Sequence, residues 1–278
     1  MRRIGFTVVC CVAISANLSA QEAPPLPKGA VARVGVHRMR VPGNIRDSAF
    51  TVDGHSFVVV HEPTDEQKEN VTIFDVASGL ARRRLPISYT YSIAVAGESS
   101  RMAVWANEGI QLWDMKTEKL VRKWKVPMGA NSESAIAISN DGTRVAVIGT
   151  MRRQPVILRL DVDSDEPLPA LYPETYTLNS IQYSPDGKKL FSISIGRSVS
   201  DGKKNTNHPG AIIAWDAKTG EKLAQRRHDQ YPVVLSADGT KIARTLEAKE
   251  VEVRDFDPKS DESIRIPIPG NCVFHFMP

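Results

Sequence analysis

The stretch that decides the fold begins Ser180-Ile181-Gln182-Tyr183-Ser184-Pro185-Asp186-Gly187. A second short run, Lys189 to Ile195, follows the Asp-Gly pair, and a later run ends in Trp215-Asp216 just before a Thr-Gly pair. Alternating apolar residues bounded by turn pairs are typical of short β-strands. The residues from Ser180 to Gln225 therefore predict four antiparallel strands in one sheet.

The same unit occurs five times along the chain. Its turn position recurs at intervals of 45, 43, 45 and 52 residues, at Asp53, Glu98, Asp141, Asp186 and Asp238. A period in the forties with four short strands per repeat indicates the blades of a β-propeller. We therefore predict an all-β propeller of about five four-stranded antiparallel blades, which would span residues 45–88, 89–130, 131–175, 176–228 and 229–270.

Each recurring residue has a structural reason. Asp-Gly supplies the positive φ that a tight hairpin turn needs, and Gly79 and Gly220 do the same at the other hairpin. A large apolar residue before the recurring Asp suits the gap between neighbouring sheets, and the Asp can accept hydrogen bonds from turn backbone. The predicted structural positions are Asp53, Gly54, Phe74, Asp75, Trp113, Asp114, Asp141, Gly142, Asp186, Gly187, Trp215, Asp216, Asp238 and Gly239.

These positions resemble the WD-repeat β-propeller family over about Ala30 to Pro278. The repeats are degenerate, because Arg159-Leu160-Asp161 and Arg254-Asp255 stand where the family has Trp-Asp. The Gly-His pair that commonly precedes the first strand is also missing. The resemblance implies an exported bacterial protein that serves as a non-enzymatic scaffold for another protein.

The N-terminus predicts a secretory signal peptide over residues 1–20. Arg2 and Arg3 precede a mostly apolar run, and small residues end at a plausible cleavage point after Ala20. An uncleaved anchor is the alternative, although the apolar run is short for a spanning helix. Residues 21–29 form a Pro-rich linker. The mature protein would be periplasmic or extracellular, with Cys272 as its one cysteine and no internal disulfide.

The two ends of residues 30–278 suggest an incomplete ring. Residues 272–278 resemble the first strand of a further blade, in the register of Ile181 to Pro185. Residues 31–41 predict a strand without partners before the first unit, which we expect to close a last blade as its outer strand. The chain would then be a fragment of a longer propeller. The alternative is a ring of five units closed by this strand and the tail.

Composition and motifs exclude several classes of function. A net charge of +4, or +2 without Arg2 and Arg3, is too weak to argue for nucleic acid. The six histidines show no metal-ligand spacing. The run from Asp161 to Asp165 begins like a calcium loop, but Glu166 replaces the required glycine. The sequence therefore predicts no catalytic, cofactor-binding or metal-binding residue and no cofactor.

The insert from Gly196 to Gly210 is the one unusual local feature. A flexible surface insertion is the simpler interpretation. The functional hypothesis is a partner-binding loop, with Asp201, Lys203, Lys204 and His208 as contact residues. The predicted function is an exported protein-interaction scaffold with an unidentified protein partner. The alternatives are a propeller enzyme or small-ligand-binding propeller with a site at the central channel, and a non-functional piece of a longer gene.

Overall fold

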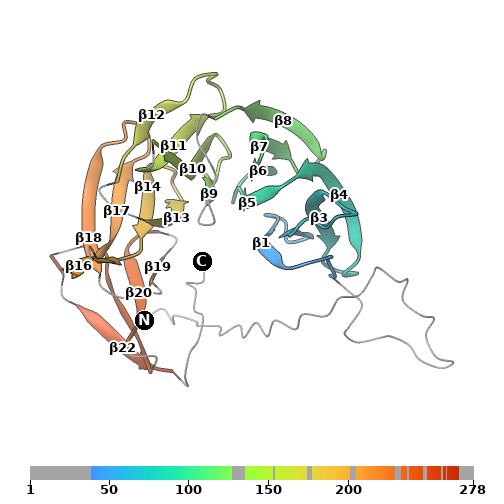
Figure 1. Ribbon diagram of the computed structural model, residues 1–278. Helices are drawn as coiled ribbons and strands as arrows, with labels where there is room; N and C mark the ends of the chain where they lie inside the picture. The colour runs from blue at the N-terminus through green and yellow to red at the C-terminus, as the bar shows by residue number, and fades with distance from the viewer. Residues whose placement is uncertain are drawn as a thin grey trace, which may run out of the picture. The chain divides into compact units, whose positions relative to one another are not determined.

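A computed structural model describes residues 39–126, 135–152, 154–173, 177–200, 205–228, 233–236, 238–246, 249–257, 259–260 and 262–268. These residues form five four-stranded antiparallel sheets and one two-stranded sheet, without a helix (Figure 1). The predicted all-β fold with five repeated sheets is confirmed. We number the four-stranded sheets 1 to 5 in chain order. The chain divides into two compact units, each described by itself.

The N-terminal unit, described over residues 39–126, contains sheets 1 and 2. Sheet 1 consists of β1 (Ile45–Phe50), β2 (Ser56–His61), β3 (Glu69–Asp75) and β4 (Ala81–Ser88), and sheet 2 of β5 (Thr90–Val95), β6 (Arg101–Ala106), β7 (Gly109–Asp114) and β8 (Lys119–Trp124). Alternate residues on β2 and β3 share one face, since Val58 pairs with Ile73 and Val60 with Val71. This face packs on Met102 of sheet 2 in one buried apolar cluster.

The C-terminal unit, described over residues 135–268 with the gaps given above, contains sheets 3 to 5. Sheet 3 consists of β9 (Ile136–Ile138), β10 (Arg144–Met151), β11 (Gln154–Asp161) and β12 (Leu168–Leu171). Sheet 4 consists of β13 (Leu178–Tyr183), β14 (Lys189–Ser194), β17 (Gly210–Asp216) and β18 (Lys222–His228). Sheet 5 consists of β19 (Val233–Leu235), β20 (Lys241–Leu246), β21 (Glu250–Asp255) and β22 (Ser263–Pro267).

Sheet 4 is buried on both faces. One face packs Trp215 and Ile213 against Ile148 and Ile157 of sheet 3. The other face packs Phe191 and its neighbours against apolar residues of sheet 5, namely Val233, Leu235, Ile242 and Phe256. A fully buried side chain of this size contributes about 1.5–3 kcal/mol through the hydrophobic effect. The period-two alternation of the sequence thus supplies an apolar surface to each neighbouring sheet.

The Asp-Gly turns join the first two strands of sheets 1, 3, 4 and 5. The glycines have positive φ values of +68°, +73°, +65° and +70°, at Gly54, Gly142, Gly187 and Gly239, as predicted. The turn is wider than the tight turn that we expected. In sheet 4, for example, Ser184 N–H donates to Lys189 C=O, which leaves four residues in the loop.

The wider turn depends on a hydroxyl two residues before the aspartate. Ser184 Oγ donates to Asp186 Oδ1 at 2.6 Å and accepts a hydrogen bond from Lys189 N–H at 2.9 Å. Asp186 also accepts the N–H of Lys188 at 3.1 Å. The same contacts occur in the other three Asp-Gly turns, from Thr51, Ser139 and Ser236. This hydroxyl recurs in the sequence, but the Asp-Gly pattern alone did not reveal its role.

A second recurring contact joins the two turns at one end of each sheet. The residue after the recurring Asp donates its N–H to a carbonyl of the first turn, as Ala217 does to Lys188 at 2.8 Å. The same bond occurs in all five sheets, where the donors are Val76, Met115, Val162, Ala217 and Phe256. The two turns at this end of each sheet are therefore joined by the same hydrogen bond in every repeat.

Several predictions concern residues outside the described part of the chain. These are the signal peptide at residues 1–20, the linker at residues 21–29 and the further strand at residues 272–278. Of the predicted closing strand at residues 31–41, only the last three residues are described, and they form no strand. No helix of the described residues is long and apolar enough to cross a membrane.

Candidate functional site

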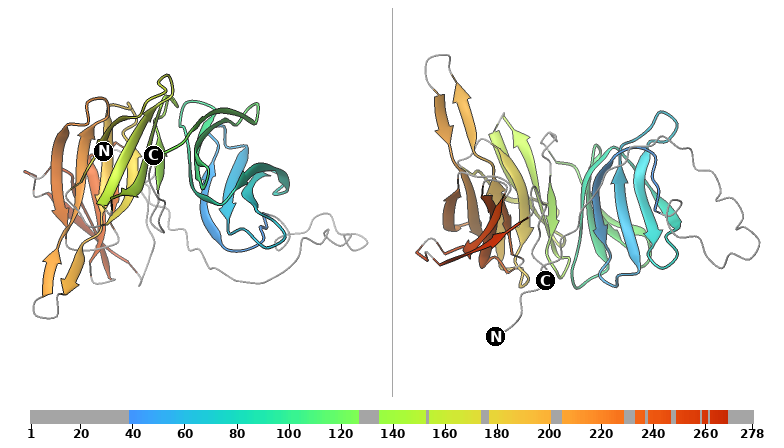
Figure 2. Two further views of the ribbon diagram at one scale, coloured as in Figure 1. Left: turned by 45° about the horizontal axis from the view of Figure 1, so that its top comes forward. Right: turned by 90° about the horizontal axis from the view of Figure 1, so that it is seen from below.

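The insert between β14 and β17 contains a hairpin. β15 (Arg197–Ser200) pairs antiparallel with β16 (Asn205–His208), from Arg197 opposite His208 to Ser200 opposite Asn205. The hairpin extends beyond the end of sheet 4 (Figure 2). The insert thus contains two short paired strands where the sequence indicated only a loop. The sequence hid these strands because their residues are mostly polar and lack the apolar alternation on which strand prediction depends.

The base of the hairpin is tightly built. A Cβ on Gly210 would lie 2.5 Å from Cε1 of His228 and 2.5 Å from the carbonyl oxygen of Ser194, so only glycine fits there. Ser194 Oγ accepts the N–H of Ala211 at 2.8 Å and donates to its carbonyl at 3.1 Å. The hairpin therefore leaves sheet 4 from a close-packed and hydrogen-bonded position.

The predicted contact residues of the insert are described only in part. His208 is the last residue of β16, next to the base of the hairpin. Asp201, Lys203 and Lys204 lie outside the described residues. The structure thus assigns the insert a strand framework, while the contacts of these four side chains stay a prediction.

The Trp-Asp pairs are structural. Trp215 is buried against sheet 3, and its indole N–H donates to Ser192 Oγ at 2.9 Å. Asp216 accepts the N–H groups of Lys218 and Thr219 at 2.9 and 2.7 Å, which confirms the expected contact with turn backbone. These two bonds, that of Thr219 first, hold the pKa of the Asp216 carboxyl below its ordinary value.

The other Phe/Trp-Asp pairs have the same geometry. Phe74 and Trp113 are buried. Asp75 accepts Ser78 N–H at 2.7 Å, and Asp114 accepts Thr117 N–H at 2.9 Å. All these aspartates accept hydrogen bonds inside their own turns, so their carboxylates have a structural role.

Arg159 is an important residue whose role the sequence did not reveal. It stands one residue before the place of the missing tryptophan, yet it is only 1% exposed. Its guanidinium donates to the carbonyls of Pro169 at 2.9 Å and of Ala217 at 3.0 Å. Gly220 makes room for it, because a Cβ there would lie 2.5 Å from Nη2. Burial lowers the pKa of Arg159, and the carbonyl contacts join sheet 3 to the turn that follows β17.

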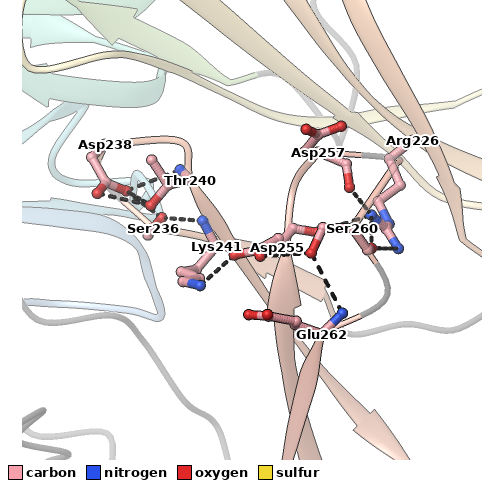
Figure 3. A network of polar contacts seen from close by, with 9 residues as sticks. All are labelled: Arg226, Ser236, Asp238, Thr240, Lys241, Asp255, Asp257, Ser260 and Glu262. Atoms are coloured by element: carbon pink, nitrogen blue, oxygen red, sulfur yellow. Dashed lines mark hydrogen bonds and ion pairs between the residues drawn. The ribbon is translucent and has the colours of Figure 1, made fainter.

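A second arginine joins sheets 4 and 5 (Figure 3). Arg226 on β18 donates to the carbonyls of Asp255 at 3.0 Å and of Asp257 at 2.5 Å. In the same network Lys241 forms an ion pair with the Asp255 carboxylate, which also accepts the hydroxyl of Ser260 at 2.8 Å. Arginine again binds the turn between the last two strands of the following sheet.

The N-terminal unit has the counterpart of this contact. Arg82 and Arg83 on β4 each pair with the carboxylate of Glu118 at 2.6 Å. Glu118 stands in the turn between β7 and β8, at the position of Gly79 and Gly220, and takes a positive φ of +53° without being glycine. Arginine contacts to the turn of the next sheet thus recur at three junctions within the two units.

Charged residues are also buried within sheet 5. Glu252 on β21 is buried and lies 2.7 Å from Nε of Arg244 on the neighbouring strand. Arg254 and Arg265 lie farther from the same carboxylate, at 3.8 and 4.0 Å. A buried carboxylate beside arginine is paired rather than free for acid–base chemistry.

Within the described ranges, no group of three or more His, Cys, Asp and Glu side chains is arranged to hold a metal ion. The acidic turn after β11 folds on itself, because Asp161 Oδ1 accepts the N–H of Asp163 at 3.0 Å. Asn70 is fully buried in β3, with its side chain bonded to Thr90.

No family model and no curated protein matches the sequence. The solved structures that resemble the chain include two that match it at low identity. One is hydrazine synthase from Kuenenia stuttgartiensis, with a TM-score of 0.60 and 18% identity over 85% of this chain and 70% of that chain. The other is the Cps50 (Swd1) β-propeller domain from Myceliophteria thermophila, with a TM-score of 0.56 and 12% identity over 86% and 73%.

The fold is a β-propeller. The five four-stranded sheets are its blades, and the long connection that carries the hairpin joins the second and third strands of the fourth blade. At these identities the likeness shows the fold of the chain and not its activity. The propeller is therefore a framework, and function has to be argued from its sites.

Proposed function

We propose that the chain is an exported, non-enzymatic interaction scaffold of WD-repeat type, which binds another protein through the β15–β16 hairpin. The hairpin carries this proposal. Within the described residues, β15 and β16 pair only with each other and belong to none of the blades. The Trp-Asp and Asp-Gly turns support the WD-repeat assignment, because they repeat the same hydrogen bonds from blade to blade.

The hairpin has the properties of a docking element. An isolated two-stranded ribbon is marginally stable in water, since it gains little from burial. Its outer edges present backbone N–H and C=O groups that a strand of a partner can pair with. Arg197, Asn205 and His208 make its sequence polar, as expected for a surface that is exposed before the partner binds. The close-packed base at Gly210 fixes where the ribbon starts.

The proposal is tested by removing the hairpin. Residues 196–209 are replaced by a short Gly-Ser linker between Ile195 and Gly210. We expect cooperative unfolding to be retained, because β14 and β17 pair directly from Ser194 opposite Ala211 onward. Partners are identified by crosslinking the full chain in an extract of its host. The dissociation constant of the purified pair is then measured by calorimetry.

The expected result is an affinity loss of at least about tenfold, the equivalent of ~1.4 kcal/mol. The matched control is Asp163→Asn, which changes an exposed turn residue at the other end of the strands and should leave the affinity unchanged. An equal dissociation constant for the hairpin variant and the full chain would contradict the proposal.

A further inference from the structure

One end of the N-terminal unit carries an exposed tyrosine in a conformation that tyrosine rarely adopts. Tyr89 lies in the connection between β4 and β5, is 45% exposed and has a φ of +53°. A bulky residue in the left-handed region is an outlier, and such outliers cluster where proteins hold ligands or partners. Met39, Glu118 and Arg152 also have positive φ. Glu118 and Arg152 lie in turns between paired strands, where this conformation is common.

The backbone around Tyr89 is held in place from both sides. Its carbonyl accepts the N–H of Asn107 at 3.1 Å. The next residue, Thr90, is held by the buried side chain of Asn70, which accepts its N–H at 3.0 Å and donates to its carbonyl at 3.3 Å. Tyr91 donates its hydroxyl to the Asn107 side chain at 3.5 Å. Two tyrosines are therefore presented on a fixed support, which reduces the entropy lost on binding.

Several carboxylates lie at the same end of the unit as this aromatic surface. Glu69 lies opposite Ser88 in the β3–β4 ladder, next to Tyr89 in sequence, and Glu108 follows Asn107. The loop before Glu69 adds further acidic residues, namely Glu62, Asp65 and Glu66.

The cations at this end neutralise only some of these charges. Arg46 pairs with Glu62 and Lys68 with Asp65, both at 3.8 Å, and Lys123 pairs with Glu108. Among the described residues, Glu66 and Glu69 make no ion pair. The surface therefore combines one exposed tyrosine, Tyr89, and one half-buried tyrosine, Tyr91, with an excess of negative charge.

We propose that this surface, formed by Tyr89, Tyr91, Asn107, Glu66 and Glu69, binds a basic peptide segment of a protein partner. The inference rests on the proposed scaffold function and assigns a second contact surface to it. A Lys or Arg side chain is attracted to the face of a tyrosine ring. The unpaired carboxylates attract the same cations and exclude acidic segments. Tyrosine suits this role because it offers a large, rigid contact with a polar end.

A purely structural role for Tyr89 makes a different prediction. If its conformation only closes the connection between two blades, Tyr89→Gly relieves backbone strain and changes nothing else, since glycine adopts positive φ freely. If the ring binds a partner, the same variant becomes more stable and binds less well. Stability and affinity then change in opposite directions, which a folding defect does not produce.

The experiment uses the full chain and two labelled ten-residue peptides, one alternating lysine with glycine and the other alternating glutamate with glycine. Fluorescence anisotropy is expected to show binding of the lysine peptide alone. Tyr89→Gly and the double variant Glu66→Gln/Glu69→Gln should each weaken this binding by about tenfold, and the double variant should also reduce its salt dependence. Tyr172→Ala removes an exposed tyrosine of the other unit and should have no effect.

The proposal is overturned if the lysine peptide does not bind, if the glutamate peptide binds equally well, or if Tyr89→Gly keeps the affinity of the parent chain. None of these results bears on the scaffold function. That function is tested separately, by comparing the affinity of the purified partner for the chain with and without the hairpin. Loss of the hairpin effect, conversely, leaves the peptide measurement intact.

Discussion

At the scale of single residues, each blade depends on side chains that satisfy turn backbone. Asp186 accepts the hydroxyl of Ser184 and the N–H of Lys188, and these bonds, the hydroxyl first, lower the pKa of its carboxyl. The folded protein therefore releases this proton more readily than the unfolded chain does. Stability from the ionised carboxylate is fully present above the ordinary pKa of about 3.9 and is lost as the pH falls through the folded value.

Asp186→Asn tests this assignment with little change in shape. The amide oxygen can still accept both hydrogen bonds but carries no charge. We expect the variant to be less stable than the parent chain at pH 7, and the difference to shrink as the pH falls below about 4. Urea denaturation at several pH values measures both. A stability difference that is the same at pH 7 and pH 2.5 would exclude a role for the ionised carboxylate.

Alanine substitutions at two glycines with positive φ distinguish the cost of backbone strain from the cost of steric crowding. Gly220 has a φ of +81°, and a Cβ there would collide with Arg159, whereas a Cβ on Gly54 would meet nothing within 4 Å. Gly54→Ala should lower stability by about 1 kcal/mol through strain alone. Gly220→Ala should lower it by more than about 2 kcal/mol, because it also displaces the buried guanidinium. If thermal or urea denaturation gives equal stability losses for the two variants, the Arg159 guanidinium can move aside without an energetic cost.

At the scale of elements, arginines join a blade to the turn of the next one at three junctions within the two units. Arg159→Met removes the donors to Pro169, Ala217 and Lys218 while keeping much of the side-chain volume. We expect a loss of about 2–4 kcal/mol in the free energy of unfolding, since buried carbonyls lose charged hydrogen bonds. Arg159→Lys should not restore it, because an ammonium group cannot span the same acceptors. Wild-type stability in the methionine variant would contradict this role.

The sequence predicts the elements best where the signal is local. Asp186-Gly187 and Trp215-Asp216 mark the two hairpins of a blade, and their spacing predicts the five sheets without any contact information. The role of Arg159 could not be predicted in this way. Its acceptors at Ala217 and Lys218 lie 58 and 59 residues further along the chain, and Arg159 stands outside the Trp-Asp pattern, one residue before the place of the tryptophan.

The sequence indicated the insert from Gly196 to Gly210 as a candidate surface without revealing its strands, and it did not indicate the tyrosine surface. The β15 and β16 strands have no apolar face, so their polar residues indicated a loop. Tyr89 follows an ordinary strand, and nothing in the neighbouring residues signals its positive φ. Its backbone is held by two hydrogen bonds instead, one from Asn107 N–H to the Tyr89 carbonyl and one from Thr90 N–H to the Asn70 side chain. Local patterns therefore predict the repeated framework, whereas the proposed contact surfaces depend on features that depart from the repeat.

At the scale of the whole molecule, each unit has its own apolar core between neighbouring sheets. The repeated turns and the arginine contacts stabilise the sheets. Their carboxylates and guanidinium groups are used in hydrogen bonds within the fold. Among the described residues, the features that we propose for binding are the hairpin in the C-terminal unit and the tyrosine surface in the N-terminal unit. We therefore propose that the blades form the framework and that the departures from the repeat form the contact sites.

The most direct test of this account is the footprint of an identified partner on the full chain, measured by amide hydrogen exchange. Binding should slow exchange in residues 197–208, where strand pairing with the partner would protect the outer edges of the hairpin, and leave the strands of sheets 3 and 5 unchanged. Slower exchange around Tyr89 would add the second surface. Protection confined to the blades, with the hairpin exchanging as fast as in the free protein, would contradict the central claim.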